Sequence, residues 1–293
     1  MKKQEQHNEQ WSEDNDFLKS MPKVELPYSR SKETVWEQME AMMDDEQKQQ
    51  TLPIQPKGKV RNLRPVIFAV AALLVFMLCT TAFLNLYTKT VNATAGQHLT
   101  ALLPDGSSIE LNAGSVIKYK PYWWYIKREV QFEGEGFFKV QKGQSFEVVS
   151  SLGRTIVLGT SFNIYARKNE YKVTCYTGKV RVVSIVSGES TDITPNQQAI
   201  VENGKVSRTD KVNTTETISW INDMFIFTGT PIQLVFEEIE RQYGIRISTT
   251  EQLNYLYSGN FTRKRSADDV VRMVCRSLGL EYQKVNGGYK ISK

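Results

Sequence analysis

The chain has 293 residues, of which 24% are charged and 40% are hydrophobic, and its formal net charge is +5. Residues 1–64 carry 11 basic and 12 acidic side chains and the remainder carries 26 and 20, so neither part is basic enough to predict direct binding to nucleic acid. The two histidines and three cysteines do not have the spacing of a zinc site, so we expect no metal site and no cofactor.

Residues 1–64 are polar apart from one amphipathic stretch. Between residues 29 and 43, large apolar side chains recur at steps of three and four, which predicts a helix with one apolar face formed by Val35, Trp36, Met39, Met42 and Met43. Ser31, followed by Thr34, indicates the start of this helix. So few apolar residues cannot readily bury a core of their own. Either the face binds in a groove of a partner protein, or it packs against Trp11, Phe17 and Leu18 in a small helical hairpin.

Residues 66–84 form a run of nineteen amino acids without a charged side chain. As a helix this run is about 28 Å long, close to the ~30 Å hydrocarbon core of a bilayer, and it has no polar face. We therefore predict one transmembrane helix over residues 65–88. Basic residues without an acidic neighbour precede it, which predicts a cytoplasmic N-terminal segment: Lys57, Lys59, Arg61 and Arg64. The expected location is a bacterial inner membrane, crossed once, with the C-terminus in the periplasm.

After the span the apolar residues change to a period of two, which predicts β-strands. Apolar and polar residues alternate at 108–112, 130–133 and 179–182, and turn signals with glycine separate the strands. These patterns predict an all-β domain over residues 89–210. The aromatic cluster Trp123, Trp124 and Tyr125 allows two interpretations, packing in the core or an exposed binding patch.

Residues 211–293 have a different rhythm, because strand-like and helix-like stretches alternate. A strand at 224–227 precedes Thr230 and Pro231, which we expect to cap and open a helix that ends at Gly244. Strands at 245–248 and 256–262, a helix capped by Ser266 and a hairpin over 280–292 follow. The predicted order is β-α-β-β-α-β-β, a small α+β domain. Cys175 and the cysteine of the second helix fall in different domains, so we expect no disulfide between them.

The sequence lacks the pattern of a catalytic site. Gly134-Glu135-Gly136 lies between strand-like stretches, with no helix behind it to hold a phosphate. His98 is the only histidine after the span, and nothing marks a serine partner for it. Glu133 and Glu135 share a strand face, which we interpret as solvated surface. We therefore predict that the protein is not an enzyme and has no catalytic residues.

Spaced motifs after the span resemble the FecR domain of transmembrane anti-sigma factors, at residues 103–107, 111–115, 134–140, 157–163 and 177–180. Residues 225–231, 239–244 and 258–261 are similar to the C-terminal domain of Bacteroidota members of that family, a domain akin to the short signalling domain of secretins and TonB-dependent receptors. One departure is Asn196, where the family often has glycine after Pro195; asparagine also adopts left-handed backbone geometry.

The resemblance implies a relay across the membrane. A TonB-dependent outer-membrane receptor with its ligand bound would signal through its signalling domain to the periplasmic domains. The segment 1–64 would then release or activate an extracytoplasmic-function sigma factor, which we expect it to bind through Val35, Trp36, Met39, Met42 and Met43. The alternative is a membrane-anchored periplasmic scaffold or binding module without a transcriptional role, which would not use this apolar face.

The resemblance also directs attention to Gly159 and Thr160, because some FecR-like proteins cut themselves at a Gly-Thr step. The Thr160 hydroxyl would attack the Gly159 carbonyl, and water would open the resulting ester. The alternative is structural: Gly159 fits a tight bend, Thr160 makes a local hydrogen bond, and Leu158 and Phe162 fill the core.

Overall fold

The computed structural model describes residues 30–48 and 63–293 of the chain. The chain divides into two compact units, residues 1–66 and 67–293. The alternative helical hairpin with Trp11, Phe17 and Leu18 lies outside the described residues, as do the basic residues at positions 57–61.

In the first unit, helix α2 runs from Lys32 to Lys48. Its start is the predicted one, since the Thr34 backbone N–H donates to Ser31 Oγ at 3.4 Å and the Thr34 hydroxyl donates to the Ser31 carbonyl at 2.7 Å. The first of these bonds satisfies a backbone N–H that the first turn of a helix leaves without a partner within the helix. The described part of α2 is exposed along its length, from Lys32 to Asp44.

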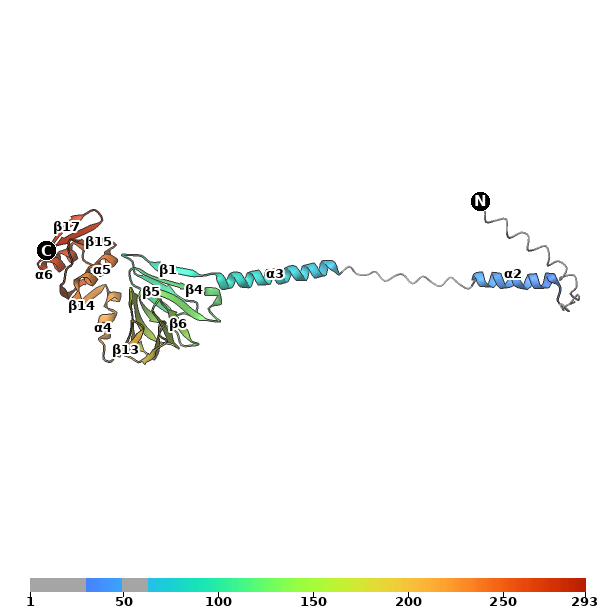
Figure 1. Ribbon diagram of the computed structural model, residues 1–293, viewed down its shortest axis with the longest axis horizontal. Coiled ribbons are helices and arrows are strands. Elements are labelled where there is room, and N and C mark those ends of the chain that lie inside the picture. Colours follow the sequence, from blue (N-terminus) through green and yellow to red (C-terminus); the bar gives the residue numbers. More distant parts are fainter. Residues whose placement is uncertain (1–29, 49–62) are drawn as a thin grey trace, which may run out of the picture. The chain divides into compact units, whose positions relative to one another are not determined.

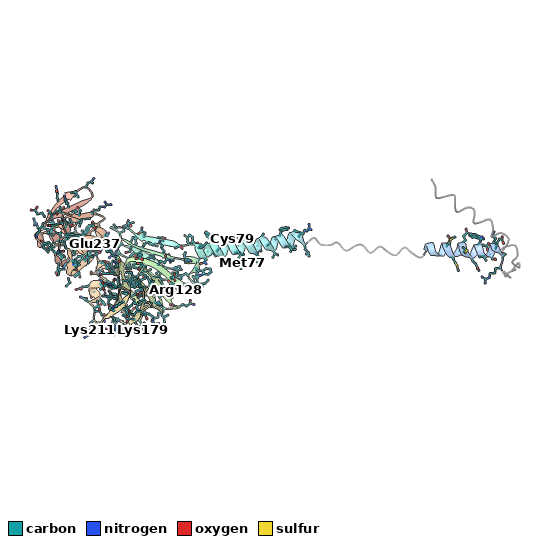
Figure 2. The ribbon with its side chains drawn as sticks, in the orientation of Figure 1. Met77, Cys79, Arg128, Lys179, Lys211 and Glu237 are labelled. Carbon is teal, nitrogen blue, oxygen red and sulfur yellow. The ribbon has the colours of Figure 1, made fainter. Side chains whose placement is uncertain are left out.

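Helix α3 (Arg64–Leu86, 23 residues) is long and apolar enough to cross a membrane. None of its side chains is buried in the structure, and Met77 and Cys79 are labelled on its surface in Figure 2. The Thr80 hydroxyl donates to the Phe76 carbonyl at 2.7 Å, so this polar group is satisfied within the helix. That arrangement suits a hydrocarbon environment, where no water is present to bind it. The helix is consistent with the predicted single-pass architecture.

Thirteen strands and one 3-10 turn form the domain that follows α3 (Figure 1). Their bounds are β1 Lys89–Ala93, β2 Leu99–Leu102, β3 Ser108–Leu111, β4 Ser115–Tyr119, η1 Pro121–Trp123, β5 Arg128–Lys139, β6 Phe146–Val149, β7 Gly153–Val157, β8 Ser161–Arg167, β9 Glu170–Thr177, β10 Val180–Ser184, β11 Ser190–Ile193, β12 Gln198–Glu202 and β13 Lys205–Thr209. The predicted all-β domain is confirmed.

Strand β5 joins the two halves of this domain. The strand order is β11-β10-β7-β6-β5-β8-β9-β12-β13, and β3 and β4 also pair with β5. Residues 128–131 of β5 pair in parallel with β6, whereas residues 134–139 pair antiparallel with β8. The strand changes direction at Gly134, which has φ +115° and where a Cβ would come within 2.4 Å of Ser115 Oγ. Glycine is required at this bend because a side chain has neither the room nor the backbone freedom.

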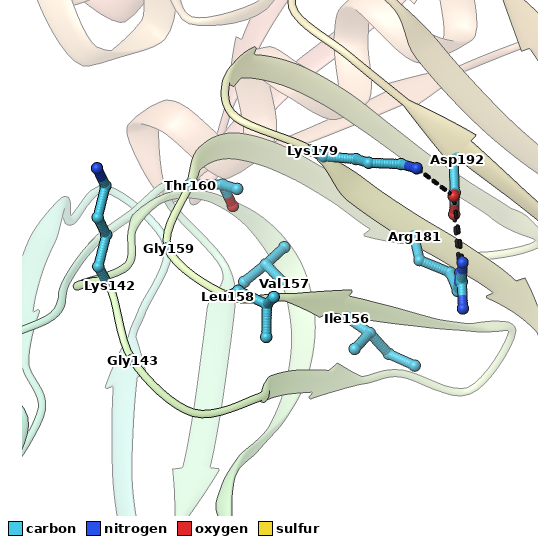
Figure 3. Close-up of a pocket in the computed structure, with 10 residues that line it drawn as sticks. All are labelled: Lys142, Gly143, Ile156, Val157, Leu158, Gly159, Thr160, Lys179, Arg181 and Asp192. Carbon is cyan, nitrogen blue, oxygen red and sulfur yellow. Dashed lines mark hydrogen bonds and ion pairs between the residues drawn. The ribbon is translucent and has the colours of Figure 1, made fainter.

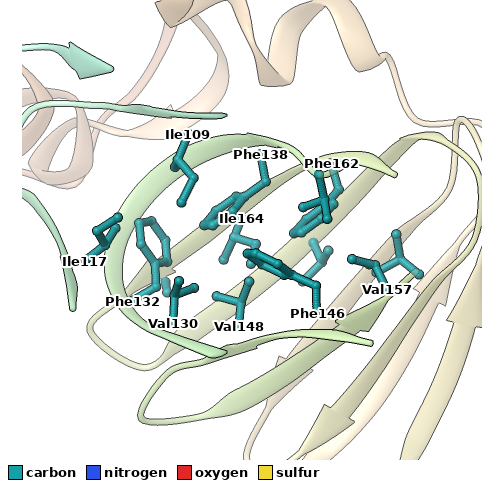
Figure 4. Packing of buried hydrophobic residues seen from close by; sticks show 14 of the residues in the cluster. Ile109, Ile117, Val130, Phe132, Phe138, Phe146, Val148, Val157, Phe162 and Ile164 are labelled. Carbon is teal, nitrogen blue, oxygen red and sulfur yellow. The ribbon is translucent and has the colours of Figure 1, made fainter. Parts of the chain in front are cut away.

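The core of the β-domain lies between these two halves (Figure 4). Phe138 stacks on Phe162 with ring centroids 5.0 Å apart and packs edge-to-face on Phe132 at 5.2 Å. Burial alternates along the strands as the period-two pattern predicts; in β10, for example, Val180 and Val182 are fully buried and Arg181 between them is exposed.

The C-terminal domain contains β14 Met224–Pro231, α5 Ile232–Tyr243, β15 Arg246–Thr249, β16 Leu256–Thr262, α6 Ala267–Ser277, β17 Glu281–Val285 and β18 Gly288–Ser292, preceded by the short helices α4 Thr214–Thr217 and η2 Ser219–Asn222. Strand β14 pairs with β16, and β18 lies between β15 and β17. This is the predicted β-α-β-β-α-β-β order. The Ser266 hydroxyl accepts a hydrogen bond from the Asp269 backbone N–H at 3.1 Å, so the predicted cap of α6 is confirmed.

The expected cap of α5 is wrong. Strand β14 continues past Phe227 through an irregularity, and Thr230 and Pro231 pair with Tyr257 and Leu256 of β16. Thr230 therefore belongs to the strand, and α5 has no side-chain cap. Instead the backbone N–H of Ile232 donates to the Tyr255 carbonyl at 3.0 Å. A backbone partner thus replaces the expected hydroxyl at the helix start.

Candidate functional site

Helix α2 carries all five of the residues predicted to bind a partner, and all are exposed. The exposed fraction is 39% for Val35, 57% for Trp36, 48% for Met39, 71% for Met42 and 56% for Met43. At 3.6 residues per turn these positions share one face of the helix. Within the described residues the face is therefore open to a partner.

Gly159 and Thr160 connect β7 to β8 at a tight crossing with the segment that follows β5 (Figure 3). Gly159 has φ +151°, and a Cβ there would lie 2.6 Å from the Lys142 Cα. The bend therefore requires glycine. Backbone hydrogen bonds fix both sides of it: the Gly143 N–H donates to the Leu158 carbonyl and the Val140 N–H to the Thr160 carbonyl, each at 2.9 Å.

The Thr160 hydroxyl is buried and has no hydrogen-bond partner among the described residues. The expected local hydrogen bond is therefore absent from this part of the chain. Phe162 is fully buried as expected, but Leu158 is 65% exposed, so its expected place in the core is wrong. Leu158 follows the last paired residue of β7 and turns outward at the bend before Gly159.

A cleft of about 620 Å³ lies beside this bend. Its apolar wall includes Ile156 and Leu158, and Asp192 lies at its charged end (Figure 3). Arg181 Nε and Lys179 Nζ each lie 2.8 Å from the Asp192 carboxylate, and together they hold the pKa of that carboxyl well below its usual range. The Asp192 carboxylate is therefore ionised and paired with two cationic side chains. An ionised carboxylate has no proton to donate, so it cannot act as a general acid at neutral pH.

A polar network between the β-domain and α5 was not predicted from the sequence. Gln242, which is 1% exposed, donates from Nε2 to Asn112 Oδ1 at 2.8 Å and to Glu238 Oε1 at 2.7 Å. Its Oε1 lies 3.0 Å from His98 Nε2, and Asn112 donates from Nδ2 to Glu135 Oε2 at 2.8 Å. The network thus joins α5 to two of the motif segments, 111–115 and 134–140.

Arginines extend this network on both sides. Arg167 donates from Nη2 to the Ala113 carbonyl at 2.7 Å, and Arg241 of α5 donates from Nη2 to Glu238 Oε2 at 2.6 Å. Asn163 Nδ2 donates to Glu135 Oε1 at 3.2 Å. A signal for this interface does exist in the sequence, since Glu238 lies on the same helical face as the buried apolar residues of α5.

Glu135 is the ionisable group most affected by this environment. Burial and the nearby Glu238 carboxylate raise the pKa of Glu135 to about 7, against the opposing influence of Arg167. Burial lowers the pKa of His98. Glu133 is exposed, but the expectation that Glu135 is also solvated surface is wrong, because β5 bends at Gly134 and directs Glu135 toward α5.

The structure also places the aromatic cluster at residues 123–125, the cysteines and Asn196. Trp124 is 1% exposed and packs edge-to-face on Tyr119 and Phe146, each at 5.7 Å, which is the core interpretation, whereas Tyr125 is 81% exposed. The described cysteines are all free, and burial raises the pKa of the thiols of Cys175 and Cys275 to about 11. Those two thiols are therefore poor nucleophiles. Asn196 has φ +68°, the left-handed geometry expected for it.

The chain resembles known proteins in both of its folded domains. Residues 89–181 match the family model described as FecR protein, and residues 224–291 match the model described as FecR, C-terminal. Two crystal structures, at 2.50 and 1.65 Å resolution, are of a protein described as a "putative anti-sigma factor" from Parabacteroides distasonis ATCC 8503. Each is 28% identical to the chain with a TM-score of 0.63, and the matches span 71% and 70% of this chain and 99% of the other.

No curated protein matches the chain. The two family models cover different segments in the same order as the two folded domains, and together they span more than half of the residues. The chain therefore belongs to the FecR family, as a member that carries the additional C-terminal domain.

Proposed function

We propose that the protein is a single-pass anti-sigma factor of a bacterial inner membrane, which relays a signal from a TonB-dependent outer-membrane receptor to an extracytoplasmic-function sigma factor. Family membership and the likeness to the two crystal structures support an anti-sigma factor role. The basic residues before α3 support a cytoplasmic α2 and periplasmic folded domains. A membrane-anchored periplasmic scaffold without a transcriptional role would not need the exposed apolar face of α2.

The observation that carries this proposal is the exposed apolar face of α2. Trp36 is 57% exposed and is flanked by Met39 and Met43 on the same face. Methionine side chains adapt to irregular grooves, and tryptophan is a frequent anchor residue of protein interfaces. We propose that this face lies in a hydrophobic groove of the sigma factor.

Replacing Trp36 with alanine tests this assignment. If Trp36 is an anchor, Trp36→Ala weakens binding of the full-length protein in detergent micelles to the sigma factor encoded beside it by about 2 kcal/mol, or roughly 30-fold. Titration calorimetry measures the affinity. The matched control is Glu37→Ala, on the opposite face of α2, which leaves the affinity within about twofold. Equal affinities for wild type and Trp36→Ala would exclude this face as the binding surface.

For the periplasmic side, we propose that the C-terminal domain binds the signalling domain of the receptor. Among the described strands, β14 pairs only with β16, and β15 and β17 are the outer strands of their sheet. Outer strands leave backbone N–H and C=O groups free to pair with a strand of another protein. A strand of the receptor's related domain provides such a partner.

We further propose that the chain cuts itself between Gly159 and Thr160. The buried Thr160 hydroxyl, which has no hydrogen-bond partner among the described residues, favours this function. Thr160 Oγ1 attacks the Gly159 carbonyl carbon, and the hydroxyl proton passes to the Thr160 nitrogen as the C–N bond breaks. Water then hydrolyses the ester, which leaves a Gly159 carboxylate and a Thr160 hydroxyl. This route needs no separate catalytic residue.

Immunoblotting of the full chain with a tag at each end tests self-cleavage. Wild type is expected to give two fragments and Thr160→Ala one intact band, because alanine lacks the nucleophile. Thr160→Ser is the control: it keeps the hydroxyl and is expected to retain the two fragments. A single full-length band in wild type, with and without inducer, would leave the bend with a structural role alone.

A further inference from the structure

The segment between β4 and β5 lies beside the end of α3. Only two residues separate the last residue of α3, Leu86, from the first residue of β1. Strand β4 runs antiparallel to β1, and Tyr119 at its end is paired with Lys89 at the start of β1. The chain that follows, residues 120–127, therefore returns to the point where α3 meets the β-domain. We call these residues the juxtahelical loop.

Direct contacts hold the juxtahelical loop against the last turn of α3. Lys120 Nζ donates to Asn85 Oδ1 at 3.3 Å. The ring of Tyr122 lies 5.4 Å from that of Tyr87, and Tyr87 in turn lies 6.2 Å from Phe83 of α3. If α3 spans a bilayer, these contacts place the loop at the level of the lipid headgroups.

The loop presents apolar side chains that the core does not take up. Trp124 is buried and fixes the loop to the β-domain, whereas Tyr122 is 58%, Tyr125 81% and Ile126 66% exposed. Tyrosine is enriched where membrane proteins meet the headgroup layer, because its ring is apolar and its hydroxyl remains in contact with water. The exposed tyrosines of the juxtahelical loop, beside the end of α3, therefore suit the headgroup layer of a membrane.

A basic cleft of about 230 Å³ lies between the loop and the helix end. Asn85 and Thr88, at the end of α3 and just after it, line the cleft together with Lys118, Lys120 and Lys127. Glu129 is the acidic residue in the lining, and it pairs with Lys127. The cleft thus keeps a net positive charge, with ammonium and amide donors that suit a phosphate.

We propose that the juxtahelical loop and its cleft bind the phosphate headgroup of an anionic phospholipid in the leaflet where α3 leaves the membrane. The lysines contact the phosphate, and Tyr125 and Ile126 enter the headgroup layer. The bound lipid then fixes the β-domain against the membrane surface. This inference rests on the proposed membrane span of α3 and is independent of the identity of the sigma factor and the receptor.

The test uses the full-length protein in nanodiscs with equal amounts of phosphatidylglycerol and phosphatidylcholine, and native mass spectrometry to count retained lipids. Wild type is expected to retain phosphatidylglycerol preferentially. The triple variant Lys118→Gln, Lys120→Gln and Lys127→Gln is expected to lose this preference, by roughly fivefold in affinity for each lysine. The matched control is Lys264→Gln, Lys284→Gln and Lys290→Gln, which removes three exposed lysines of the C-terminal domain and is expected to behave as wild type.

Equal retention of phosphatidylglycerol by the two triple variants would overturn the proposal. A second readout is hydrogen exchange of residues 118–128, which we expect to slow in phosphatidylglycerol nanodiscs and not when inorganic phosphate is added to the protein in detergent. Equal protection by inorganic phosphate would show a free-anion site and overturn the assignment to lipid. Extraction of wild type from membranes by alkaline carbonate would overturn the span itself, whereas a change confined to the lysine variants concerns the loop alone.

Discussion

Glu135 lies where the β-domain meets α5, and both of its carboxylate oxygens accept hydrogen bonds from asparagine side chains. The ionised groups that influence it are Glu238 of α5, which opposes its charge, and Arg167 of β8, which favours it. Two carboxylates in one buried network disfavour simultaneous ionisation. Protonation of Glu135 therefore stabilises the contact between the two domains.

This arrangement predicts a pH dependence with a definite sign. Because the pKa of Glu135 is raised to about 7 in the folded protein, its contribution to stability is complete below the unfolded pKa and is lost as the pH rises through about 7. From about pH 5 to about pH 8, the free energy of unfolding of wild type should fall relative to that of Glu135→Gln by about 1 to 3 kcal/mol.

Urea titration of both proteins at each pH measures this difference. The comparison with Glu135→Gln removes the opposite contribution of His98, whose lowered pKa makes stability fall as the pH decreases and is common to both proteins. A difference between wild type and Glu135→Gln that stays constant over this range contradicts the assigned burial of the charge.

At the scale of single residues, exposed candidates could be predicted and buried polar ones could not. The stripe that contains Trp36 is visible because α2 has a helical period and few other apolar residues. Gln242 and Asn112 have no such signal, since their roles depend on contact between segments 130 residues apart. The bend at Gly159 was one of two alternatives for the Gly-Thr step. The Thr160 hydroxyl has no hydrogen-bond partner among the described residues, and this depends on the surrounding packing.

Among the elements, the two helices of the C-terminal domain show what a capping residue requires. Ser266 directly precedes α6 with an extended backbone, and its side chain reaches the Asp269 N–H, so it caps the helix. Thr230 is instead paired with Tyr257 in strand β14, one residue too far from the start of α5. Periodicity and turn signals predict where strands and helices follow one another in the sequence. The parallel pairing of β5 with β6 and of β15 with β18 could not be predicted, because periodicity does not specify partners.

The cap of α6 gives a prediction at this scale. Ser266→Ala is expected to lower the free energy of unfolding by about 1 kcal/mol, because the Asp269 backbone N–H loses its acceptor. Ser266→Asn, which supplies another side-chain acceptor, is expected to recover most of the loss. Chemical denaturation of the full-length protein in detergent micelles measures both. Equal stability of Ser266→Ala and wild type would show that the cap contributes nothing.

At the scale of the whole molecule, hydropathy separates the polar segment 1–64 and the apolar helix α3 from the rest of the chain, and the periodicity of the apolar residues separates the two folded domains. The contact between those two domains, which joins motif segments of the β-domain to α5, was not predicted. Glu238 on the apolar face of α5 marks that a polar contact exists there, but it does not identify the partner segment. A small rotation of a single helix is poorly transmitted to a polar segment beyond it. In the proposed relay, a change in association or a cut at Gly159 is therefore the more effective signal.

The most direct test of the proposed relay is a transcriptional reporter controlled by the partner sigma factor, in cells that contain the receptor and its ligand. The full chain is compared with a chain from which residues 217–293 are deleted, and immunoblotting of membrane fractions confirms that both proteins are inserted. We expect ligand to change transcription only in cells with the full chain, because the deleted domain provides the receptor contact. An unchanged response in cells with the inserted, truncated chain would contradict the proposed relay.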